Sequence, residues 1–202
     1  MQEWRISMKT KKLDLLPLKA LKVNDFFWNK YTGLVTKEII PYQWKALNDE
    51  VADAEPSYCI DNFKVAAGLK EGTFHGWVFQ DTDLAKWLEA VAYSLSYEPN
   101  EALEKLADDA IELVGKAQQE NGYINTHFTI LHPGKQYCNL KEGHELYTTG
   151  HFIEAAIAYY EVTGKDKFLN IMKKNADLIC DVFHTEKYKN AVPGHEEIEL
   201  AL

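Results

Sequence analysis

The run from Gly143 to Gly164, GHELYTTGHFIEAAIAYYEVTG, concentrates two histidines, three glutamates and four aromatic residues. A neutral imidazole donates one hydrogen bond and accepts another, so His144 and His151 suit the recognition of hydroxyl groups. Polar groups at the start of a buried helix need partners, and a ligand is one such partner. The alternative is structural: the histidines bond to backbone groups, and Glu145 lies in a first helical turn, where the macrodipole favours an acid.

The second half of this run is predicted to be a helix that ends at Gly164, since glycine is common just past the last turn. Its apolar residues recur at helical spacing and should face a core. They are Phe152, Ile153, Ala156, Ile157 and Tyr160.

The same spacing predicts further helices on both sides. They cover residues 25–40, continued over 42–47 after Pro41, and then 61–67, 81–95, 99–119, 166–183 and 196–202. Asn24 or Asp25 is expected to cap the helix over 25–40, and Asp81 or Thr82 the helix over 81–95. The aromatic residues at 26–28 are expected in the core rather than stacked on a sugar. Residues 1–23 are predicted to form an N-terminal arm, extended over 13–23, and residues 123–128 a short extended piece.

The composition describes a packed domain of 202 residues, 46% hydrophobic and 12% aromatic, with a net charge of −9. The negative charge disfavours nucleic-acid binding. No apolar run approaches the ~18 residues of a membrane span, and the N-terminus lacks a signal peptide. Cys59, Cys138 and Cys180 form no CxxC pair, which predicts a reduced, cytoplasmic protein with no zinc site built from these cysteines alone. Translation starts at Met1 or Met8.

An internal repeat indicates how the helices are arranged. Trp87-Leu88-Glu89-Ala90 matches Phe152-Ile153-Glu154-Ala155, and each is followed by a turn and a second amphipathic helix. The unit is therefore a helical hairpin, and its long loops suit an α/α toroid with a site at its mouth. The last helix carries no stop signal, so we expect residues 24–202 to be the N-terminal portion of a longer toroid. Its uncovered apolar faces should favour aggregation or a homodimer.

Five segments together resemble the catalytic domain of the β-L-arabinofuranosidases of glycoside hydrolase family 127. They are FFWNKYTGLVTKEIIPYQWKALND, VFQDTDLAKWLEAVAYSL, QQENGYINTHF, GHELYTTGHFIEAAIAYYEVTG and PGHEEIELAL, in the family's order. The resemblance implies an all-α, (α/α)6 barrel. It also implies an exo-acting, retaining glycosidase of carbohydrate metabolism that releases L-arabinofuranose from arabinose-containing oligosaccharides.

The resemblance also implies that the catalytic residues and some of the sugar-binding residues lie in different parts of the full-length enzyme. A cysteine nucleophile, held with other cysteines and a glutamate on zinc, and an acid/base glutamate are expected beyond residue 202. No catalytic residue and no metal ligand is assigned in this chain, which alone is expected to bind no zinc and to be inactive.

What carries over is sugar binding. His144 of GHELY and His195 of PGHEEIE match family histidines that contact the sugar, while Glu145 and His151 fall near the same site. For His75, His127, His132 and His184 a structural role is expected, as it is for Asp81. Two alternatives remain: a non-catalytic carbohydrate-binding or vestigial helical domain, and a protein-binding repeat scaffold, which should end in a polar capping repeat.

Overall fold

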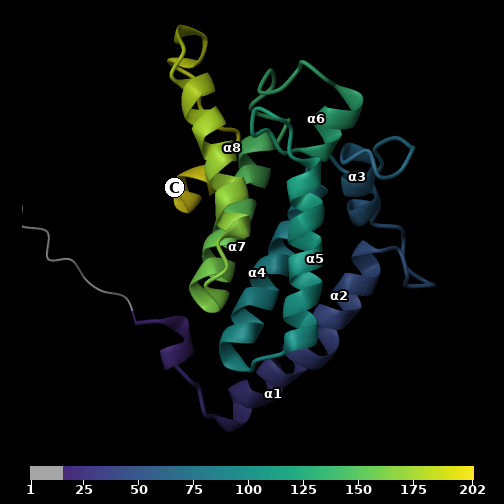
Figure 1. The fold of residues 1–202 in the computed structure, drawn as a ribbon, viewed down its shortest axis with the longest axis vertical. Helices are drawn as coiled ribbons and strands as arrows, with labels where there is room; N and C mark the ends of the chain where they lie inside the picture. The colour runs from purple at the N-terminus through teal and green to yellow at the C-terminus, as the bar shows by residue number, and fades with distance from the viewer. Residues whose placement is uncertain (1–15) are drawn as a thin grey trace, which may run out of the picture.

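A computed structural model describes residues 16–202, in which every regular element is helical (Figure 1). The α-helices are α1 (Phe26–Leu34), α2 (Ile40–Leu47), α3 (Cys59–Ala66), α4 (Asp81–Tyr97), α5 (Glu101–Ala117), α6 (Thr126–Leu131), α7 (Glu145–Thr163), α8 (Lys167–Phe183) and α9 (Glu197–Ala201). The predicted arm lies partly outside the described residues. Its described part contains a 3₁₀ turn, Leu18–Ala20, and so is not extended throughout.

The helices α4, α5, α7 and α8 form two layers of hairpins, as expected for part of an α/α toroid. The helix α4 packs along α7, and α7 packs against α9, while α5 and α8 contact each other in the second layer. Figure 1 shows these helices side by side. The repeated segments Trp87–Ala90 and Phe152–Ala155 lie on the two inner helices α4 and α7, so the repeat in the sequence corresponds to a repeated hairpin.

The inner helices bury most of their surface. On α4 the whole predicted stripe is buried: Leu84, Trp87, Leu88, Val91, Ala92 and Leu95. On α7 Phe152, Ile153 and Ala156 are buried as predicted, but Ile157 and Tyr160 are exposed. The prediction for those two was wrong, because apolar spacing did not show which face of α7 its neighbours α4, α8 and α9 leave uncovered. Ala155 and Ala158 are buried by those neighbours instead.

The first helical run is continuous through Pro41. Asp25 caps α1, accepting from the backbone N–H groups of Phe27 at 2.8 Å and Trp28 at 3.0 Å, as predicted. A π-helical segment, Val35–Ile39, joins α1 to α2 just before Pro41, where the missing N–H interrupts the α-helical ladder. The core prediction for residues 26–28 was wrong, since Phe26 is 94% exposed and the next two rings are also exposed.

Two other local predictions were wrong. Residues 126–131 form α6 instead of an extended piece, because the Asn125 side chain caps it by accepting from the Phe128 N–H at 3.0 Å. Asp81 does not cap α4; its carboxylate accepts from the N–H of Thr126 at 2.7 Å and from that residue's hydroxyl at 2.5 Å. This pair ties the start of α4 to the start of α6.

Within residues 16–202, none of the helices combines the length and apolar character that crossing a bilayer requires.

Candidate functional site

The ring of Tyr147, in the first turn of α7, contacts three histidine rings. Its centroid lies 4.6 Å from that of His151, 4.6 Å from that of His195 and 5.8 Å from that of His144. The spacing explains two of these contacts, because His144 and His151 lie three residues before and four residues after Tyr147 on one helical face. The third arrives from the segment that precedes α9. The two histidines predicted to contact a sugar, His144 and His195, therefore share one aromatic neighbour.

His144 presents a hydrogen-bond acceptor. Its backbone is left-handed, with φ of 52°, and it forms the N-cap position of α7. Its Nδ1 lies 2.8 Å from the carbonyl oxygen of Glu142. A carbonyl oxygen only accepts, so Nδ1 carries the proton, and Nε2 of the neutral ring keeps its lone pair. The Phe79 ring, with its centroid 5.3 Å away, supports the imidazole from the side.

His195 presents the complementary group. Its Nδ1 accepts from the backbone N–H of Glu197 at 3.1 Å, so the proton of the neutral ring is on Nε2. The side chain is half exposed, and its ring packs on Tyr147. The two histidines that contact the Tyr147 ring thus carry different free groups, an Nε2 acceptor on His144 and an Nε2–H donor on His195. A hydroxyl group, which donates and accepts at once, matches this pair.

His151 is held farther inside. Burial, together with the nearby Lys86 ammonium, lowers the pKa of His151 to about 4, so the ring is neutral at pH 7. Its Nδ1 lies 3.0 Å from Oε1 of Glu197 and 3.8 Å from Oε2 of Glu154. The structure brings His151 to the same aromatic ring as the other two histidines, but its Nδ1 faces the carboxylates of Glu154 and Glu197.

Glu145 is turned into the protein. Its side chain is 3% exposed and accepts from the Tyr123 hydroxyl, while both of its oxygens lie 2.9 Å from the N–H of Tyr137. Burial raises the pKa of the Glu145 carboxyl. These hydrogen bonds tie the first turn of α7 to Tyr123 and to Tyr137 in the segment before α7. This geometry lets Glu145 hold the backbone of the adjacent His144 in position. Its predicted contact with the sugar stays a prediction.

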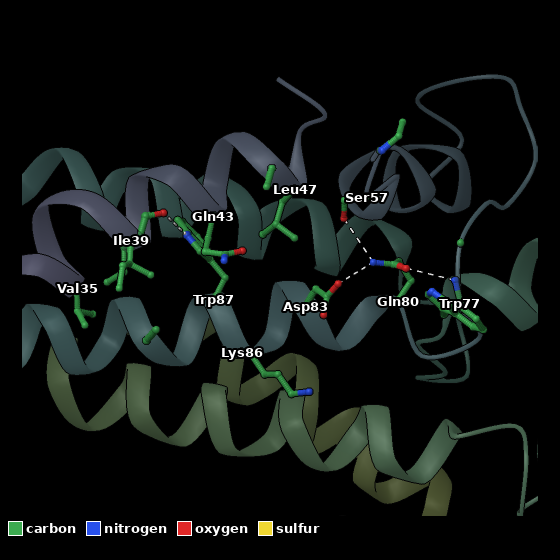
Figure 2. A pocket seen from close by; sticks show the side chains of 15 residues that line it. Val35, Ile39, Gln43, Leu47, Ser57, Trp77, Gln80, Asp83, Lys86 and Trp87 are labelled. Carbon is green, nitrogen blue, oxygen red and sulfur yellow. Dashed lines mark hydrogen bonds between the residues drawn. The ribbon is translucent and has the colours of Figure 1, made fainter. Parts of the chain in front are cut away.

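Lys86 connects the histidine cluster to a groove. Its ammonium donates to the Tyr147 hydroxyl at 2.9 Å and lies 5.3 Å from the centre of that ring. The same residue lines a mainly apolar groove of about 550 Å³ between α2 and α4. In Figure 2, Gln80 at the end of this groove bonds to Ser57 and Asp83 and accepts from the Trp77 N–H.

The sequence did not single out Tyr147 or Lys86. The helical offsets from His144 and His151 could have indicated Tyr147, whereas Lys86 lies on another helix and no local pattern marks it. For the other histidines the structural role stays a prediction: the His127 ring packs beside Phe74 and Phe128, whereas His184 is exposed. The backbone of His75 bonds to the Asn62 side chain through both its N–H and its carbonyl.

The family resemblance implies zinc in the full-length enzyme, and the described cysteines do not fit it. Cys59 is buried, donates to the Gln80 carbonyl at 3.4 Å, and has a pKa raised well above its ordinary value by burial, so it is a thiol. Cys138 and Cys180 are exposed. Within residues 16–202, no cysteine belongs to a group of three potential metal ligands.

Comparison with known proteins places this geometry in a family. Residues 20–202 match the family model described as β-L-arabinofuranosidase, GH127 catalytic domain. A non-reducing end β-L-arabinofuranosidase of Bifidobacterium longum subsp. longum is 39% identical in an alignment 193 positions long, which covers 87% of this chain and 29% of that protein.

Solved structures agree. A GH127 β-L-arabinofuranosidase from Geobacillus stearothermophilus T6 is 56% identical with a TM-score of 0.86, over 89% of this chain and 28% of that one. A second GH127 β-arabinofuranosidase is 33% identical with a TM-score of 0.81, over 92% of this chain and 30% of that one.

The two layers of helical hairpins and the match to the family model define part of the catalytic domain of a glycoside hydrolase. This chain belongs to the GH127 β-L-arabinofuranosidase family, and it spans less than a third of the relatives it matches.

Proposed function

We propose that this chain forms part of the sugar-binding wall of a retaining β-L-arabinofuranosidase, with His144 and His195 contacting the terminal arabinofuranose. The observation that carries the proposal is the pairing of these two rings. Two histidines far apart in the sequence meet at the Tyr147 ring and present an acceptor and a donor through their Nε2 atoms.

This arrangement suits a small sugar. Sugar hydroxyls donate and accept hydrogen bonds, and a site that satisfies a particular hydroxyl rejects analogues without it, because its own polar groups are left unpaired. The aromatic rings of Tyr147 and Phe79 supply apolar surface beside the imidazoles, which suits the C–H faces of a sugar ring. The family membership supports a β-linked arabinofuranoside as the ligand.

Bond cleavage belongs, in this proposal, to residues of the complete enzyme that lie outside this chain. There, zinc would hold a cysteine in the thiolate form as the nucleophile, and a glutamate would act as acid/base. Alone, the chain is expected to behave as a non-catalytic carbohydrate-binding domain, which was the alternative raised by the sequence.

Binding and turnover can be measured separately. Residues 1–202 should bind methyl β-L-arabinofuranoside, detected by saturation-transfer NMR, and release no arabinose from it. His144→Ala and His195→Ala should each weaken binding about tenfold or more, as expected when a buried partner loses its hydrogen bond. The control is His184→Ala, because His184 is exposed beyond the end of α8.

Absence of saturation transfer with the folded chain would contradict the binding role. Release of arabinose by residues 1–202 would contradict the assignment of cleavage to other residues.

A further inference from the structure

Beside the proposed sugar site, three potential metal ligands converge from two helices. His151 and Glu154 lie one turn apart on α7, and Glu197 is the first residue of α9. His151 Nδ1 is 3.0 Å from Glu197 Oε1 and 3.8 Å from Glu154 Oε2, and one ligand atom from each residue lies within 4.8 Å of the others. Atoms bound tetrahedrally to one zinc ion lie about 3.4 Å apart, given bonds of about 2.1 Å, so this spacing is close to that of a ligand set.

A glycine makes the convergence possible. A Cβ atom added at Gly150 would lie 2.7 Å from Cγ of Glu197 and 3.0 Å from its carbonyl carbon and oxygen. Any larger residue at this position would push α9 away from α7. Gly150 therefore lets Glu197 reach over the His151 ring.

The ligand atoms of His151 and Glu197 are buried and lack hydrogen bonds, whereas Glu154 is partly exposed. Among residues 16–202, both ring nitrogens of His151 and Oε1 of Glu197 have no hydrogen-bond partner. Nδ1 and Oε1 lie close to each other, but without the alignment that a hydrogen bond requires. Glu197 is only 8% exposed. Buried polar atoms without partners are costly, and one bound ion would satisfy two of them at once, a ring nitrogen of His151 and Oε1 of Glu197.

The charges around the cluster favour a cation. The carboxylates of Glu154 and Glu197 lie within 4.8 Å of each other, and Glu89 adds a further acidic group nearby. The Lys86 ammonium opposes a second cation, but it donates to the Tyr147 hydroxyl. Two carboxylates this close repel each other, so they share either a proton or a metal ion.

We propose that His151, Glu154 and Glu197 bind a divalent transition-metal ion, for which zinc fits the donor set best. One imidazole and two carboxylates give three protein ligands and leave one position for water. The site contains no cysteine, so it differs from the zinc site that the family resemblance implies. Its role is structural: the ion holds α9 against α7, and because the Glu197 N–H bonds to His195, it also keeps His195 beside Tyr147.

Cobalt titration of residues 1–202 under reducing conditions tests the proposal. Co²⁺ reports its ligands through its absorption spectrum. We expect one equivalent to bind, with weak d–d bands and without the strong charge-transfer band of a thiolate ligand. Zinc should displace it and raise the Tm, because a ligand that binds only the folded state stabilises it.

Matched variants locate the ion. Glu197→Gln and Glu154→Gln should each weaken Co²⁺ binding about tenfold or more. Glu161→Gln, an exposed change on the same helix, and His184→Ala should leave it unchanged. Circular dichroism checks that each variant keeps its helical content.

The proposal is overturned if no stoichiometric binding occurs, if Glu197→Gln binds Co²⁺ like the unchanged protein, or if a thiolate band appears. If no metal binds and Glu154→Gln raises the Tm of the metal-free chain, the carboxyl groups of Glu154 and Glu197 share a proton instead of a metal ion. Metal content and cobalt absorption do not depend on arabinose, so failure of this test leaves the sugar-binding proposal standing, and the reverse also holds.

Discussion

At the scale of single residues, the backbone decides what each histidine offers. The left-handed conformation of His144 brings its Nδ1 to the Glu142 carbonyl, and this fixes the proton on that nitrogen. The N–H of Glu197 fixes the opposite arrangement in His195. Two identical side chains thus become an acceptor and a donor, which is how a site built from one residue type can still discriminate among hydroxyl groups.

Asp81 should make stability depend on pH in a direction opposite to that of an ordinary surface acid. Its carboxyl is 1% exposed, and burial raises its pKa to about 6. Since its folded pKa exceeds the unfolded one, the folded state takes up the proton first, and the free energy of unfolding contributed by this group rises as pH falls from about 6 toward 4. The limit is about 3 kcal/mol, from 1.36 kcal/mol per pKa unit.

Urea unfolding at pH 7.5 and pH 4.5 measures this effect by comparing the unchanged chain with Asp81→Asn. The lowered pKa of His151 acts against acid stability, but it is present in both proteins and cancels in the comparison. Relative to Asp81→Asn, the unchanged chain should have a higher free energy of unfolding at pH 4.5 than at pH 7.5. If Asp81→Asn instead gained stability relative to the unchanged chain at the lower pH, the assigned pKa of Asp81 would be contradicted.

The sequence identified His144 and His195 because their motifs resemble those of a family, and it could go no further from the residues themselves. The protonated nitrogen of each ring depends on a backbone partner whose position follows only from the fold. Lys86 illustrates the same limit: its contact with Tyr147 joins two helices that are far apart in the chain. The resemblance also named Glu145, whose buried bonds to Tyr123 and Tyr137 no sequence pattern reveals.

At the scale of elements, the close approach of α9 to α7 depends on Gly150. Gly150→Ala should lower the free energy of unfolding by about 1–3 kcal/mol, the usual cost of overpacking, despite the better helix propensity of alanine. Gly33→Ala is the matched control. It is also a glycine within a helix, but its added methyl would meet nothing within 4 Å, so it should stabilise the chain by about 0.5–1 kcal/mol.

Urea midpoints of the two variants give the comparison. If Gly150→Ala were as stable as Gly33→Ala, the helices α7 and α9 would not be in tight contact at this glycine.

Long amphipathic helices were predictable, and short ones much less so. The stripe of α4 was correct because apolar spacing over many residues averages out local exceptions. The helix α6 was missed because six residues carry almost no periodicity, and its start depends on the Asn125 cap. The exposure of Phe26 was missed for another reason: whether an aromatic ring is covered depends on neighbours that helical spacing does not specify.

At the scale of the whole molecule, one side of the helical layers presents an apolar groove. It runs between α2 and α4, and Val35, Ile39 and Trp77 contribute exposed apolar surface to it. Figure 2 shows Val35 and Trp77 near its two ends. A contiguous apolar surface of this kind favours association, which gives the homodimer expected from the sequence a physical basis in the described residues.

Residues 1–202 should therefore associate through this groove. Light scattering after size-exclusion chromatography should show a dimer or larger species at micromolar concentration, and Ile39→Lys should shift it toward monomer, because a lysine in the wall cannot be desolvated cheaply. Tyr42→Lys provides the control: Tyr42 is similarly exposed on the adjoining α2 but does not line the groove. A monomeric unchanged chain, or equal effects of the two substitutions, would show that association does not use this surface.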